Sequence, residues 1–181
     1  MPSKIADFLD SLARYARTCP EHRALAGEYA AFVGAGEPVF HRSHLAGHLT
    51  GSAFVVSADG RRALLLHHAK LDRWLQPGGH ADGDTDLAAV ALREAEEETG
   101  LLGLVVEADL FDLDRHTIPA RGAEPEHQHW DVRYVVRCTG EEAPRINRES
   151  RAFAWRAIDD LAGDGSLDPS IRRMAARWLA R

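Results

Sequence analysis

Hydrophobic residues near the N-terminus recur three and four positions apart. This spacing covers residues 4–17 and predicts an amphipathic helix. A second helix is predicted from His22 to Val33, because the stretch GAGEP that follows contains helix-ending glycine and proline. We therefore predict a helical extension over residues 1–40.

The middle of the chain has the short apolar runs and alternation of β-strands. Residues 51–57 and 61–68 flank the turn signal Asp59-Gly60, which predicts a β-hairpin. Further strands are predicted near residues 104–113, 127–137 and 151–158.

Two more helices are indicated by their terminal residues. One ends near Thr99, before Gly100, and its cap is Asp84, Thr85 or Asp86. The other is a terminal helix, with Asp168 as its predicted cap and Pro169 at its first position. Strands and helices mix without regular βαβ alternation, so we predict an α+β fold or a compact α/β/α sandwich over residues 41–181.

Strand alternation within residues 127–137 separates a polar face from an apolar one. His127, His129, Asp131 and Arg133 share the first face, while the second should pack into the core. A solvated edge strand explains such a pattern. A polar face turned toward a substrate explains it equally well.

Charge is concentrated in one window of an otherwise ordinary composition. Of the 181 residues, those from Asp82 to Glu98 account for the entire net charge of −6. There is no basic stripe, so no extended nucleic-acid surface is expected. No apolar run has the length of a membrane span, and the two cysteines have no metal or redox spacing. These features favour a cytoplasmic protein.

The acidic window places three carboxylates on one helix face. Glu94, Glu97 and Glu98 stand at positions i, i+3 and i+4. They repel one another unless a cation neutralises them, and Mg²⁺ prefers carboxylate oxygens. Gly78 and Gly79, just before the helix, allow close approach of backbone to a ligand. The alternative is a solvated acidic surface.

The stretch GGHADGDTDLAAVALREAEEETGL resembles the signature box of the Nudix hydrolase family. Gly79 matches the first glycine, and the rest of the signature follows in register: Arg93, Glu94, Ala95, Glu97, Glu98, Gly100 and Leu101. Thr85 departs from the pattern, because the box has a glutamate there. Asp82, Asp84 or Asp86 is a candidate for supplying the missing charge.

The resemblance implies an enzyme with an α/β/α sandwich around a mixed sheet. It would hydrolyse a diphosphate bond in a nucleoside diphosphate linked to another group, with Mg²⁺ or Mn²⁺. By resemblance, Glu94, Glu97 and Glu98 would bind the metals, together with the Gly78 carbonyl. Glu94 and Glu97 would be catalytic, and Arg93 would hold a catalytic glutamate.

The remaining candidates concern the substrate, a small nucleotide-derived diphosphate. We predict contacts from six residues: Lys70, Gly79, His80, His127, His129 and Arg133. Glu149 is a candidate for a further metal ligand or base, since some Nudix enzymes place a glutamate in that loop. The oligomeric state is open and includes a homodimer.

Two other functions are compatible with the resemblance. One is a Nudix-fold binding or regulatory module without catalysis, but such modules usually lose box glutamates. The other is an isoprenoid-diphosphate isomerase, which would require a cysteine in its active site. Cys19 and Cys138 lie far from the box in sequence.

Overall fold

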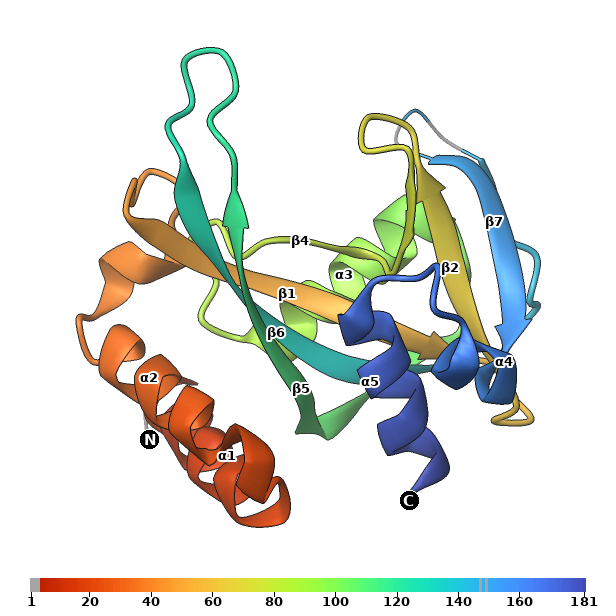
Figure 1. Ribbon diagram of the computed structural model, residues 1–181, viewed down its shortest axis with the longest axis horizontal. Coiled ribbons are helices and arrows are strands. Elements are labelled where there is room, and N and C mark those ends of the chain that lie inside the picture. The colour runs from red at the N-terminus through yellow and green to blue at the C-terminus, as the bar shows by residue number, and fades with distance from the viewer. Residues whose placement is uncertain (1–3, 147, 149) are drawn as a thin grey trace.

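A mixed sheet of seven strands forms the centre of the computed structural model, which describes residues 4–146, 148 and 150–181 (Figure 1). Five strands run in the order β3-β2-β1-β6-β5, while β4 pairs with β1 and β7 pairs with β2. The strands are β1 (Gly47–Val56), β2 (Arg62–His68), β3 (Arg73–Leu75), β4 (Gly78–His80), β5 (Leu104–Ile118), β6 (His127–Cys138) and β7 (Ser150–Ala157).

Helices cover both faces of this sheet, as the α/β/α prediction requires. Figure 1 shows α3 (Leu87–Thr99) behind the sheet and α5 (Pro169–Leu179) in front, preceded by the short α4 (Ile158–Gly163). Two further helices, α1 (Lys4–Thr18) and α2 (Arg23–Val33), pack side by side, and short 3₁₀ segments cover Pro20–His22 and Glu37–Phe40. None of the helices in the described ranges is long and apolar enough to cross a membrane.

The predicted N-terminal extension shares its core with the rest of the chain. Phe8, Leu12 and Val33 belong to the same buried apolar cluster as residues of α3 and β6. The Tyr29 hydroxyl lies 2.9 Å from the backbone carbonyl oxygens of both Asp114 and Asp131. Burial and hydrogen bonding thus attach α1 and α2 to β5 and β6.

Strand β6 is central, lying between a parallel β1 and an antiparallel β5. The alternative of a solvated edge strand is therefore wrong. The predicted core packing of the other face is confirmed, because Val132, Tyr134 and Val136 are buried in the apolar cluster with α3.

Strand β1 changes partner along its length, and this divides the sheet. It pairs with β2 at Val56 and Ala63, whereas its first half pairs with β4 from Thr50 to Ser52. After Ala63, β2 and its partner β7 turn away from β1 (Figure 1). Strand β4, which comes just before the acidic helix in the sequence, pairs with the edge of β1 that β2 does not cover.

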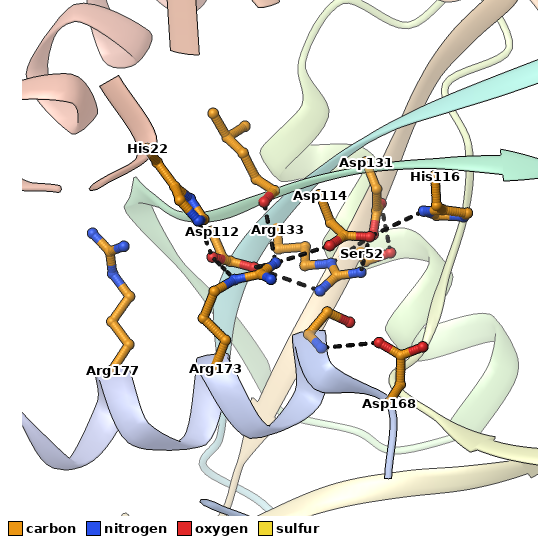
Figure 2. Close-up of polar contacts among 12 residues, drawn as sticks. His22, Ser52, Asp112, Asp114, His116, Asp131, Arg133, Asp168, Arg173 and Arg177 are labelled. Carbon is orange, nitrogen blue, oxygen red and sulfur yellow. Dashed lines mark hydrogen bonds and ion pairs between the residues drawn. The ribbon is translucent and has the colours of Figure 1, made fainter. Parts of the chain in front are cut away.

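A buried network of charged side chains lies on the α5 face of β5 and β6 (Figure 2). Arg133 is 2% exposed, and its Nε donates to Asp131 at 2.7 Å. Its other nitrogens lie 3.5 Å from Asp112 and 3.3 Å from Asp114. From α5, Arg173 bonds Asp112 at 2.7 Å and Asp114 at 2.9 Å. Opposite charge and hydrogen bonds thus offset the cost of burying these groups.

The network sets the charge of Asp114. Burial alone would raise the pKa of this carboxyl, but the hydrogen bond from His116 and the charges of Arg133 and Arg173 outweigh it. Its pKa is consequently held well below the usual range.

Replacing Arg133 by methionine is expected to lower the free energy of unfolding by about 3–5 kcal/mol, because a buried carboxylate would lose its cationic partner. Denaturant titration measures this loss. Arg137→Met on the same strand is the matched control, since Arg137 is 43% exposed in its pair with Glu107. The control should lose about 1 kcal/mol or less. Equal losses in the two variants would contradict a structural role for Arg133.

Candidate functional site

The acidic helix α3 begins and ends at residues that its sequence specifies. Asp86 is the N-cap, and its side chain accepts a hydrogen bond from the Ala89 N–H at 3.2 Å. Gly100 ends the helix in the left-handed conformation, with a φ of 65°. Val90 and Ala95 are buried, so the apolar side of α3 packs on the sheet.

Two of the three glutamates lie directly against β4. Glu98 is 7% exposed, and its Oε2 accepts a hydrogen bond from the Gly78 N–H at 2.8 Å. A Cβ built on Gly79 would stand 2.3 Å from Oε2 of Glu94, so only glycine leaves room for this carboxylate. Glu97 is exposed. The predicted cluster is thus assembled from α3 and the glycines of β4.

This donor set suits a hard divalent cation. Three carboxylates on one helix face supply oxygen ligands, and the glycine backbone gives access to them. Among the described residues, the ligand atoms of the three glutamates do not all come within 4.8 Å of one another. Mg²⁺ usually takes only a few protein carboxylates and completes its coordination with water and substrate oxygens.

Arg93 lies between two carboxylates. Its Nη1 is 3.5 Å from Asp84, and its Nη2 is 3.4 Å from Glu94. Asp84 is further oriented by the Asp86 N–H, which donates to its Oδ1 at 2.9 Å. Asp84 therefore supplies a carboxylate beside Arg93, next to the position where Thr85 departs from the box.

The other two acidic candidates pair elsewhere. Asp82 forms an ion pair with Arg42, and Asp86 caps α3 and binds Lys4 at 2.8 Å. The helix cap is thus Asp86, and the suggestion that Thr85 serves as the cap is wrong.

Three of the predicted substrate-binding residues lie together in the structure. His80, His127 and His129 come together, with ring centroids 5.2 Å apart for both His80–His129 and His127–His129. Lys70 is exposed in the turn after β2, away from this group in the chain. Glu149 lies outside the described residues.

Arg133 does not point outward toward a ligand. Its guanidinium is buried and bonded to aspartates of β5 and β6, as Figure 2 shows. This geometry favours a structural role over the expected contact with substrate.

His48 is a residue that sequence reasoning missed. It is 1% exposed, and its ring centroid lies 5.0 Å from His80, 5.0 Å from His127 and 4.9 Å from His129. Only the structure identifies His48 as a member of this group, because the parallel pairing of β1 with β6 places it opposite His129. Burial and the neighbouring imidazoles of His80 and His127 together lower the pKa of His48 to about 4.

Comparison with known families matches residues 48–178 to the NUDIX domain. A Mycobacterium tuberculosis protein named "Putative 8-oxo-dGTP diphosphatase 3" is 32% identical over 126 residues, covering 66% of this chain and 54% of that protein. A Streptomyces rubellomurinus protein named "CMP-5'-(N-acetyl-N-hydroxy-3-aminopropyl)phosphonate hydrolase" is 30% identical over 125 residues, covering 62% and 53%. The chain thus spans about half the length of these relatives.

Solved structures show the same fold. A Caenorhabditis elegans Ap4A hydrolase complex superposes with a TM-score of 0.58 at 17% identity, covering 73% of this chain and 95% of that one. A MutT protein from Methanosarcina mazei Go1 gives 0.57 at 19% identity, covering 74% and 94%. The predicted mixed-sheet sandwich is confirmed by these matches.

Replacing Asp86 by alanine is expected to lower the free energy of unfolding by about 1 kcal/mol, because α3 loses its N-cap. Thr85→Ala is the control and should change stability by less than about 0.5 kcal/mol. Thermal or denaturant unfolding of both variants measures the difference. A larger loss for Thr85→Ala would show that Thr85, and not Asp86, stabilises the start of the helix.

Proposed function

Because this chain belongs to the NUDIX domain family, we propose that it is a divalent-metal-dependent hydrolase of a diphosphate bond in a nucleotide-derived substrate. One observation carries the proposal: Glu94 and Glu98 are held against the glycines of β4, beside Glu97 on the same helix face. A merely solvated acidic surface would not bury Glu98 or require glycine at position 79.

Glu94, Glu97 and Glu98 would hold Mg²⁺ or Mn²⁺, together with the Gly78 carbonyl. When bound, such a cation polarises a phosphoryl oxygen and lowers the pKa of a water molecule. The fixed backbone N–H of Gly78 keeps the Glu98 carboxylate in one orientation.

Arg93 would act as a positioning residue. It contacts Asp84 on one side and Glu94 on the other, so it restrains the Glu94 carboxylate and partly offsets its charge. Glu94 and Glu97 are the candidates for orienting or deprotonating the attacking water. Asp84 in turn holds Arg93 from the loop before the helix.

The substrate class follows from the relatives. Two of them carry names with a nucleotide, 8-oxo-dGTP in one and a CMP-phosphonate in the other. We therefore propose a small nucleotide-derived diphosphate, with the exposed Lys70 as a candidate for contacting it.

The two rival functions have weaker support. A binding module without catalysis would not need the three box glutamates, all of which are present. An isomerase site would need a cysteine, but Cys19 bonds Arg177 and Cys138 lies against the carbonyls of residues 140 and 141. Both cysteines are buried.

Replacing Gly79 by alanine is expected to lower turnover by about 100-fold with little loss of stability. The new methyl group would displace the end of the Glu94 side chain, which can rotate away cheaply but no longer contributes to the site. Gly27→Ala in the middle of α2 is the control, since nothing lies within 4 Å of its added Cβ. It should keep full turnover and gain about 0.5–1 kcal/mol of stability.

The function itself is tested by phosphate and pyrophosphate release from a panel of nucleoside triphosphates, nucleotide sugars and dinucleoside polyphosphates, with and without Mg²⁺. Glu97→Gln and Glu98→Gln should each lower Mg²⁺-dependent release by about 100-fold or more. Glu96→Gln is the matched control, because Glu96 lies in the same helix but outside the shared face, and it should keep full activity. Absence of Mg²⁺-dependent release across the panel, or full activity of Glu98→Gln, would reject the proposal.

A further inference from the structure

We propose a second metal site, distinct from the glutamates, in which His48, His80 and His129 bind a transition-metal ion of the Zn²⁺ class. Within the described part of the chain, these three residues form the one group whose ligand atoms all lie within 4.8 Å of one another. They come from β1, β4 and β6, three strands that pair side by side. The proposal does not depend on the hydrolase function.

The site lies on the face of the sheet that is turned away from α3. A Cβ on Gly51 would stand 2.8 Å from Val90 of α3, so the odd-numbered positions of β1 face that helix. His48 has the opposite parity and therefore faces away. The strand pairing then places His80 and His129 beside it.

The spacing of the nitrogens is close to what a bound ion needs. Zn–N bonds of about 2.0–2.1 Å in a tetrahedron place two ligand nitrogens about 3.4 Å apart. The ligand atoms of the three histidines all lie within 4.8 Å of one another. Rotations of the side chains would bring the nitrogens to the spacing that the ion needs.

Buried ring nitrogens in this group have no hydrogen-bond partner. Both nitrogens of His48 and Nε2 of His129 are buried and unpaired. His48 is only 1% exposed, so water does not satisfy it from outside. Leaving a buried polar group without a partner destabilises the fold. A shared cation would accept one lone pair from each neutral ring and so satisfy one nitrogen of His48 and Nε2 of His129.

A fourth histidine is oriented in the way that metal ligands usually are. Nδ1 of His127 donates to the Pro125 carbonyl at 2.8 Å, which leaves a lone pair on Nε2 in the neutral ring. That Nε2 is buried and without a hydrogen-bond partner, with Glu124 3.8 Å away. The His127 ring stacks on His48. His127 therefore forms the wall of the site next to its three ligands.

The electrostatic environment favours a metal over an anion. Binding of phosphate would require protonated imidazoles, whereas a metal requires neutral ones. Burial lowers the pKa of His48 to about 4 and that of His129 to about 2. Imidazole nitrogens are donors that select Zn²⁺, Co²⁺ or Ni²⁺ over Mg²⁺.

The proposed ion would fasten β4 to the central strands. His80 follows Gly78 and Gly79 directly, and those residues contact Glu98 and Glu94. An ion at the histidines would thus restrain the strand that carries the glycines of the box.

The experiment uses metal-free full-length protein in excess Mg²⁺, which occupies carboxylates and leaves imidazoles available. Titration with Co²⁺ should give one equivalent of intense visible absorption typical of a four-coordinate, nitrogen-rich site, and Zn²⁺ should displace it. Zn²⁺ should also raise the unfolding temperature. His48→Gln and His129→Gln should weaken Zn²⁺ binding about 100-fold or more.

His67→Gln is the matched control, because His67 lies on β2 against Trp74 and outside this group. It should bind Co²⁺ as the unchanged protein does. Circular dichroism and unfolding without metal check that each variant folds, and His80→Gln, at a partly exposed position, replaces any variant that does not. Absence of the Co²⁺ absorption, or its persistence in the folded histidine variants, would overturn the proposal.

Discussion

The contact between Arg133 and Asp131 is the constraint on which the centre of the molecule depends. Both side chains are buried, so each needs the other, and Asp131 also accepts hydroxyl hydrogen bonds from Thr50 and Ser52 at 2.8 Å. These bonds connect β6 to β1, while Asp112 and Asp114 connect it to β5 and α5. A shift of one residue in the register of β6 would turn these charges onto the apolar face. The network therefore specifies the pairing of the sheet as well as stabilising it.

Strand β4 connects the two proposed sites because it presents a different face to each. The backbone at Gly79 contacts Glu94 on the side of α3, whereas the neighbouring His80 joins the histidines on the opposite side. This arrangement requires the first half of β1 to be free of β2, and the sheet provides it by pairing those strands at Val56. The division of the sheet is thus a precondition for the site and not a defect in strand pairing.

The longer elements were predictable because local patterns specify them. Helical spacing identified α1, the stretch GAGEP marked the end of α2, and Gly100 marked the end of α3. Asp168 was correctly predicted as the cap of α5, where its side chain accepts a hydrogen bond from the Ser170 N–H at 2.9 Å. The strands β3 and β4 have three residues each, too few to show a period, and they exist through pairing with distant strands. The polar face of β6 was identified, but its partners on β5 and α5 are remote in sequence. For this reason the sequence did not separate the buried ion pairs of Arg133 from the histidine cluster at His129.

Thr85, where the chain departs from the box, shows the same limit of sequence-based prediction for a single side chain. A linear pattern records a missing glutamate there, but Arg93 is reached by the carboxylate of Asp84, one residue earlier. The Asp86 N–H fixes that carboxylate in a tight turn, while Asp86 itself caps the helix. The two acids on either side of Thr85 thus divide the tasks of contacting the arginine and capping the helix. A carboxylate thus still lies beside the guanidinium, and the loop supplies it from a different position in the chain.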